Sequence, residues 1–160
     1  MTAEVLITSL EKLLALHKSL LEVAVQKTTV IKNGDIGSLQ QLLKDEQMHV
    51  AAIQKVEMMR QETVHTFVKN KQTPTVHDCL KYVSKEEEKK ITLVTAQLTD
   101  VITALKEQNE LNQQLIHHSL QFVNMSLQLI RPQPNAMNYS PPTKKQRPPK
   151  ETPGLFNSQA

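Results

Sequence analysis

Two short motifs contain the residues best suited to hold a metal ion. Glu46 with His49, and Glu62 with His65, each match Glu-x-x-His, the motif with which helical bundles bind a pair of iron ions. Such a site takes one copy from each of two facing helices and adds further carboxylates. Here both copies belong to one predicted helix, about 24 Å apart along its axis. We therefore expect no metal site and no cofactor.

The remaining reactive side chains form no recognisable catalytic set. Cys79 is the only cysteine, and nothing around it activates a thiol, so we interpret it as a small apolar residue. His117 and His118 are adjacent and must point to different faces of a helix. His17 is interpreted as a hydrogen-bonded core residue. With no glycine-rich loop for a nucleotide either, we predict that the protein is not an enzyme.

Charge and proline divide the chain into a body and a tail. Residues 1–131 carry equal numbers of basic and acidic residues, whereas residues 132–160 supply the net charge of +3. Seven of the eight prolines also lie in that tail. We predict a helical domain over residues 1–131 and a disordered, basic tail over residues 132–160.

The same composition excludes several partners and compartments. A nucleic-acid-binding domain concentrates basic charge on a folded face, and the body is neutral, so we expect no nucleic acid. No apolar stretch approaches the length that spans a bilayer, and the first residues do not resemble a signal peptide. A single cysteine excludes an intramolecular disulfide. We expect a cytoplasmic protein without stable membrane insertion.

Helical periodicity runs through the body and is interrupted at only two places. Apolar residues recur every three or four positions over residues 2–32, from Asp35 or Ser38 to residue 67, and over residues 84–131. The stripe of the second segment, expected to face the other helices, includes Ile36, Leu43 and Val50. Ser38 with Gln41, Thr75 with Asp78, and Ser84 with Glu87 have the spacing of capping boxes, the second of them opening a short extra helix. The predicted fold is all-α: an antiparallel bundle of three long helices, or an extended coiled-coil hairpin.

The last predicted helix is longer than its two partners. At 1.5 Å per residue it spans about 70 Å, against about 45–50 Å for each of the others. We expect its final turns to extend past the turn at residues 33–37 and to keep an apolar stripe without an internal partner. Such a stripe usually has an external partner.

Polar residues interrupt the apolar stripes at a few positions. They are Glu46, Glu57, Arg60, Asn109 and Asn112. One interpretation is register control, because a buried polar layer fixes helix pairing at a cost in stability. Glu57 and Arg60, three residues apart, could also pair with each other. The other interpretation is a loosely packed bundle whose faces receive a visiting helix.

Several segments resemble the FlgN family of flagellar export chaperones, in the family's order along the chain. The entry to the second helix carries Gly34-Asp35, Leu39, Leu42-Leu43 and Glu46-Gln47. The last helix carries Asn109-x-x-Asn112-x-x-Leu115 and Leu120-x-Phe122-Val123, and the tail carries Asn138-Tyr139 and an ending from Leu155 to Ala160. One departure is that Ser140-Pro141-Pro142 stands where the family has a glycine soon after the tyrosine.

This resemblance implies a cytosolic chaperone without ATPase activity for the hook-associated junction proteins FlgK and FlgL. It would hold their disordered, helix-forming ends, prevent premature assembly and hand them to the flagellar type III export apparatus. We expect the client on the end of the last helix, with two tail aromatics as further anchors. The candidate residues are Leu115, Ile116, Leu120, Phe122, Val123, Leu127, Ile130, Tyr139 and Phe156.

Other classes of protein fit the same pattern of residues. A structural coiled-coil homo-oligomer or an adaptor protein would also carry long amphipathic helices and no catalytic set. In the first case the stripe at the end of the last helix would close a homodimer rather than receive a client.

Overall fold

The computed structural model describes residues 2–131 of the chain. The tail over residues 132–160, with Tyr139 and Phe156, lies outside the described residues. The elements are α1 (Thr2–Asn33), α2 (Ile36–Phe67), α3 (Val76–Cys79), a 3-10 turn η1 (Leu80–Tyr82) and α4 (Lys85–Ile130). The all-α prediction is confirmed over the described part of the chain, within which no strand occurs.

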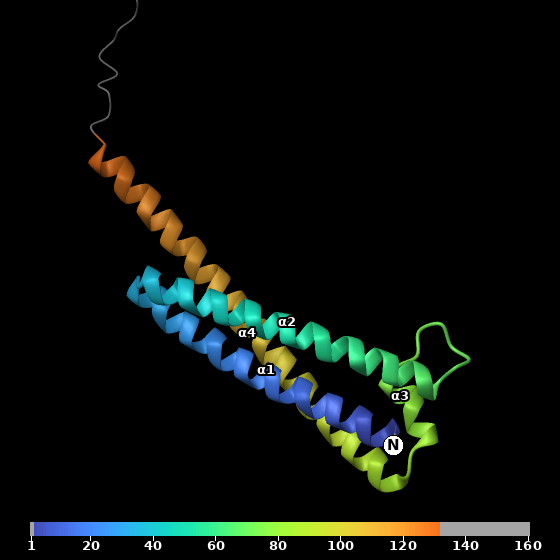
Figure 1. Cartoon of the computed structure of the whole chain (residues 1–160). Coiled ribbons are helices and arrows are strands. Elements are labelled where there is room, and N and C mark those ends of the chain that lie inside the picture. The colour runs from blue at the N-terminus through green and yellow to red at the C-terminus, as the bar shows by residue number, and fades with distance from the viewer. Residues whose placement is uncertain (1, 132–160) are drawn as a thin grey trace, which may run out of the picture. The chain divides into compact units, whose positions relative to one another are not determined.

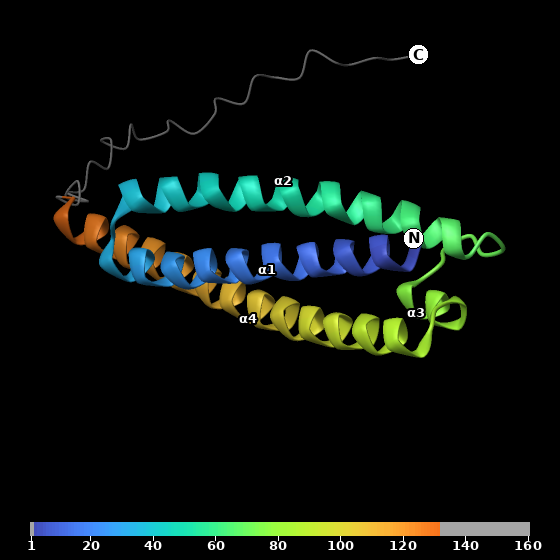
Figure 2. The ribbon, with the colours of Figure 1, turned by 60° about the horizontal axis from the view of Figure 1, so that its bottom comes forward.

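The chain divides into two units, residues 1–120 and residues 121–160, and the second is described only as far as residue 131. In the first unit α1 and α2 lie side by side and antiparallel (Figure 1). The portion of α4 in this unit runs parallel to α1, so that α1 has a neighbouring helix on two sides (Figure 2). No helix among residues 2–131 combines the length and apolar character needed to cross a bilayer.

The turn between α1 and α2 is built from Gly34 and Asp35. Gly34 has a φ of +67°, a left-handed conformation that glycine adopts without steric cost. The Asp35 carboxylate then caps α2 by accepting a hydrogen bond from the Ser38 backbone N–H at 3.1 Å. Hydrogen bonds from Ser38 also lower the pKa of Asp35. The capping box predicted for Ser38 and Gln41 is therefore wrong, because Asp35 takes the capping position three residues earlier.

The other two predicted capping boxes are confirmed. The Thr75 and Asp78 side chains each bond the other's backbone N–H at the start of α3. Ser84 and Glu87 do the same at the start of α4, and hydrogen bonds from the Ser84 backbone and side chain lower the pKa of Glu87. These pairs satisfy backbone donors that the helix itself leaves free.

The apolar core gathers the start of α1, the end of α2, α3 and the start of α4. Its buried members are Leu6, Leu10, Leu14, Val64, Val68, Cys79, Ile91 and Val94. All of these except Cys79 are aliphatic, as a chain without tryptophan and with only three phenylalanines requires. This core holds one end of the first unit together.

The apolar seam predicted on α2 is partly wrong. Ile36, Leu43 and Val50 were expected to face the other helices, but each is exposed. The side chains that α2 turns toward α1 include His49, which bonds Ser19 across the interface. A regular three-and-four spacing fits more than one stripe on the same helix, and the position of α1 selects which stripe is covered.

Candidate functional site

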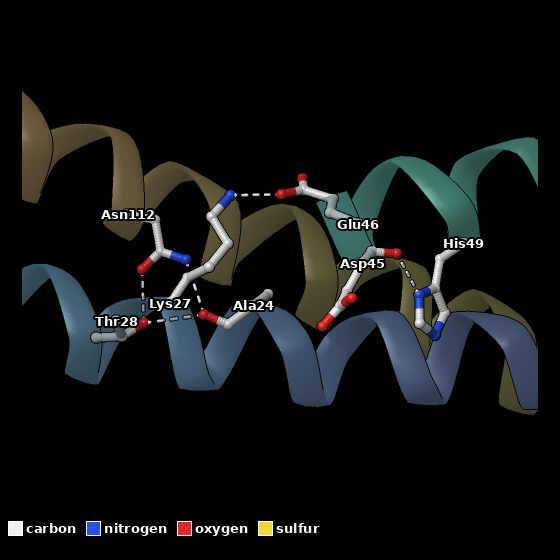
Figure 3. A network of polar contacts seen from close by, with 7 residues as sticks. All are labelled: Ala24, Lys27, Thr28, Asp45, Glu46, His49 and Asn112. Atoms are coloured by element: carbon white, nitrogen blue, oxygen red, sulfur yellow. Dashed lines mark hydrogen bonds and ion pairs between the residues drawn. The ribbon is translucent and has the colours of Figure 1, made fainter. Parts of the chain in front are cut away.

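One Glu-x-x-His pair of α2, Glu46 with His49, contacts α1, whereas Glu62 and His65 of the other pair are exposed. Glu46 forms an ion pair with Lys27 at 2.7 Å, and His49 Nε2 lies 2.7 Å from the Ser19 hydroxyl. His49 Nδ1 lies 2.7 Å from the backbone carbonyl of Asp45, to which it donates (Figure 3). This donation leaves Nε2 as the acceptor for Ser19. Over residues 2–131, no group of three or more histidine, cysteine or acidic side chains converges to hold a metal ion.

The lone cysteine and the first histidine have structural surroundings. Cys79 is fully buried in the core, and burial raises the pKa of its thiol, which keeps it protonated and unreactive. His17 Nδ1 lies 2.7 Å from the Leu13 carbonyl, so the predicted hydrogen bond is present, but the side chain is half-buried and lies outside the core. His117 and His118 are exposed and meet edge to face, with ring centroids 6.2 Å apart.

Apolar side chains become exposed along α4 near the end of the first unit. Leu115 is half-buried, Ile116 is at the margin of exposure and Leu120 is exposed. Ile116 and Leu120 are four residues apart and so share a face of the helix. Asn112, one turn before Ile116, is the last fully buried residue of α4.

In the second unit, the described residues of α4 expose every candidate side chain. Phe122 is 72% exposed, and Val123, Leu127 and Ile130 are exposed as well. Val123, Leu127 and Ile130 follow at steps of four and three, so they lie along one face. Phe122, Met125 and Leu129 follow at steps of three and four and form a second stripe on the other side of the helix. We name the two stripes together, over positions 116–130, the α4 terminal face; its members are Ile116, Leu120, Phe122, Val123, Met125, Leu127, Leu129 and Ile130.

Two members of this face were not among the predicted site residues. Met125 and Leu129 are 64% and 86% exposed. Leu129 continues the spacing of the buried seam, which makes it look like a core residue in the sequence. An unbranched methionine adapts its shape to different partners, so Met125 suits a binding surface.

A second feature missed in the sequence is the absence of charge along this stretch. No Asp, Glu, Lys or Arg occurs from Leu111 to Ile130, and the polar positions there are asparagine, glutamine, serine and histidine. Such a surface can bind a partner through apolar burial and neutral hydrogen bonds, without ion pairs. The signal was present as a gap in the charge pattern, and only a count of charges per segment would have found it.

A shallow groove lies on α4 earlier in the first unit. It has a volume of about 650 Å³ and is lined by Ile102, Leu105, Lys106, Asn109, Glu110 and Gln113. All six lining residues come from α4 itself, so the groove is a face of one helix rather than a cleft between elements. It offers a second, more polar surface and no chemistry of its own.

The sequence of the chain is similar to those of known proteins. The chain matches the family described as FlgN protein over residues 1–147. It is 32% identical over its whole length to the uncharacterized protein YvyG of Bacillus subtilis (strain 168), whose whole length is also covered. No solved structure matches the chain. The chain belongs to the FlgN family, the family of flagellar export chaperones.

Proposed function

We propose that this chaperone binds the disordered, helix-forming ends of the hook-associated junction proteins FlgK and FlgL in the cytoplasm. It keeps them from assembling before secretion and delivers them to the flagellar export apparatus. The observation that supports a client site is the α4 terminal face, where eight large apolar side chains are exposed within fifteen residues. A monomeric protein rarely leaves so many large apolar side chains exposed on one segment without a partner.

The size of this surface is sufficient for useful affinity. Removing roughly 400 Å² of apolar area from water contributes around 10 kcal/mol at about 25 cal/mol per Å². A disordered client that folds on binding loses about 2–5 kcal/mol of this in ordering, before the entropy of association is counted. The remainder is compatible with a complex that forms in the cell and still releases its client.

Phe122 is the proposed anchor because it is the largest apolar side chain on this part of α4. Large aromatic side chains contribute most to interface energies, and 72% of its surface is available. Tyr139 and Phe156 are proposed as further anchors for the client or for the export apparatus; both lie outside the described residues.

Alanine variants of the face test the proposal. Phe122→Ala and Leu127→Ala should each weaken capture of a FlgK or FlgL terminal segment by at least tenfold, because each removes apolar contact area. Gln128→Ala, which changes an exposed polar residue beside Leu127, is the matched control and should bind normally. Normal client binding by both apolar variants, with unchanged helical circular dichroism, would refute the proposed site.

Sedimentation of the same variants separates a client site from a homodimer. If the α4 terminal face closes a dimer instead, Phe122→Ala and Leu127→Ala should convert a dimer to a monomer while client capture stays intact. That result would favour a structural coiled coil.

Salt dependence gives an independent test of how the client is held. Because residues 111–130 carry no charged side chain apart from any ionised histidine, affinity measured at pH 8 should change less than threefold between 50 mM and 500 mM NaCl. A loss of tenfold or more over this range would show that ion pairs elsewhere on the chaperone hold the client.

A further inference from the structure

The apolar seam between α1 and α4 repeats at intervals of seven residues. On α1 the repeat that leads to Thr28 is Ile7, Leu14 and Leu21, and on α4 the repeat that leads to Asn112 is Ile91, Leu98 and Leu105. The two helices run parallel within the first unit (Figure 2). A shift of α4 along α1 by seven residues would therefore place aliphatic residues against aliphatic residues again, so these apolar contacts discriminate poorly between registers.

One buried polar layer interrupts this repeat. Asn112 of α4 is 2% exposed, and its amide donates a hydrogen bond to the Ala24 carbonyl of α1 at 2.8 Å. Its side-chain oxygen accepts from the Thr28 hydroxyl at 2.5 Å (Figure 3). Gln108, one turn earlier on α4, donates to the same Thr28 hydroxyl. The layer thus joins two turns of α4 to one turn of α1.

Lys27, the residue before Thr28 on α1, makes a polar contact with α2 in the way that Thr28 does with α4. Lys27 pairs with Glu46 of α2 at 2.7 Å, and its side chain is only 10% exposed (Figure 3). Residues 24–28 of α1 therefore hold both α2 and α4 at the same level of the first unit. No loop enforces this alignment, because eight residues separate α2 from α3 and can extend over about 27 Å.

We propose that the Thr28–Asn112 layer is a register lock that positions α4 on α1. A shift of α4 by seven residues in one direction would place Asn112 beside Leu21, which has no hydroxyl, so the Asn112 side-chain oxygen loses its Thr28 partner while its amide nitrogen meets the His17 carbonyl in place of that of Ala24. A shift in the other direction would place Leu105 beside Thr28 and leave Asn112 unpaired with α1. An unpaired buried amide is unfavourable, so the layer selects one register among several that the apolar residues tolerate.

The lock is a positioning device rather than a source of stability. Replacing Asn112 by leucine leaves no buried group without a partner, because the Thr28 hydroxyl can donate to the Ala24 carbonyl, 3.2 Å away. We therefore expect Asn112→Leu to melt at or above the temperature of the unmodified protein and yet to lose its unique register. If Asn112 only stabilised the fold, Asn112→Leu would melt at a lower temperature and keep a single register.

Distances between two spin labels measure the register in the full-length chain. Glu4→Cys on α1 and Lys106→Cys on α4 place labels at exposed positions of the first unit, and buried Cys79 remains in place. The parent protein should give one distance by pulsed electron paramagnetic resonance. With Asn112→Leu added, a second population should appear, displaced by about 10 Å, the rise of seven helical residues.

Asn109→Leu is the matched control, since Asn109 lies one turn before Asn112 and faces the shallow groove instead. It should keep the single distance of the parent. If Asn112→Leu does not fold, Thr28→Val removes the partner hydroxyl with little change of shape and should produce the same second population. A single, unshifted distance in the folded Asn112 variant, or in the Thr28 variant should it be needed, would overturn the proposal.

Discussion

The two ends of α4 carry the same kinds of residue at the same spacing and have opposite surroundings. Near its start, Ile91 is 1% exposed and packs with Leu6, Val64 and Cys79. Near its end, Leu129 is 86% exposed. Helical periodicity determines which side chains share a face of a helix, whereas their burial depends on whether another element covers that face.

The start and the end of α4 therefore have separate roles, the first in stability and the second, as we propose, in binding. The start of α4 contributes to the core of the first unit, where three helices and α3 exclude water. The end of α4 carries an uncharged apolar face that contributes to no described core. For a chaperone of the FlgN family, an already folded helix is a useful template, because only the client then loses conformational entropy on binding.

The largest effect should come from a matched pair of truncations at the two ends of α4. Ile91→Ala should lower the free energy of unfolding by about 2–5 kcal/mol, because it leaves a cavity in the core. Leu129→Ala should change it by less than about 0.5 kcal/mol, because that side chain is already in water. Urea denaturation followed by circular dichroism measures both, and equal losses would contradict the division of α4 described above.

A smaller effect is expected from the ion pair within α2. The Arg60 guanidinium donates to the Glu57 carboxylate through Nε at 2.8 Å and through Nη2, and this contact lowers the pKa of Glu57. Arg60 is largely buried and Glu57 about one-third exposed, so the pair lies between a surface and a buried salt bridge. Arg60→Met should cost about 1 kcal/mol. Lys55→Met, which removes an exposed basic side chain of α2, is the control and should be nearly neutral.

The smallest effect concerns the cap of α3, whose contribution to stability is present at neutral pH and lost in acid. Hydrogen bonds from Lys71 and Thr75 hold the pKa of Asp78 well below its usual range. Because the folded pKa lies below the unfolded one of about 3.9, Asp78 stabilises the fold above that value. This contribution should be lost as the pH falls below about 5 toward the depressed folded value.

Asp78→Asn should therefore reduce stability at pH 7 and flatten its decline between pH 5 and pH 2. Asp100→Asn, at an exposed position of α4, serves as the control. Urea midpoints measured across this pH range provide the comparison. An unchanged decline in the Asp78 variant would show that other carboxylates govern acid unfolding.

Much of the fold could be predicted because its signals are local. Capping residues such as Thr75 and Asp78 satisfy backbone groups within one turn, so their spacing is sufficient to place a helix start. The face of α2 that meets α1 could not be predicted in the same way. Ile36, Leu43 and Val50 form a regular stripe, and only the path of α1 leaves that stripe in water.

The candidate site shows the same limit. The length of the last helix and its apolar spacing predicted an exposed stripe, and the exposure of Phe122, Val123 and Leu127 agrees with it. The role of Asn112 depended on distant residues: its partners Ala24 and Thr28 are more than eighty positions away. From the sequence, register control was one of two interpretations of Asn112. Its hydrogen bonds to α1 identify the atoms through which it would set the register.

Hydrogen–deuterium exchange of the full-length chaperone, with and without a FlgK or FlgL terminal segment, tests most directly whether the α4 terminal face holds the client. Backbone amides over residues 116–130 lie in a helix whose apolar side chains are exposed, so they should exchange readily in the free protein. We predict that bound client slows amide exchange over residues 116–130 at least tenfold and leaves exchange in α1 and α2 nearly unchanged. Unchanged exchange over residues 116–130, with slower exchange in α1 or α2, would contradict it.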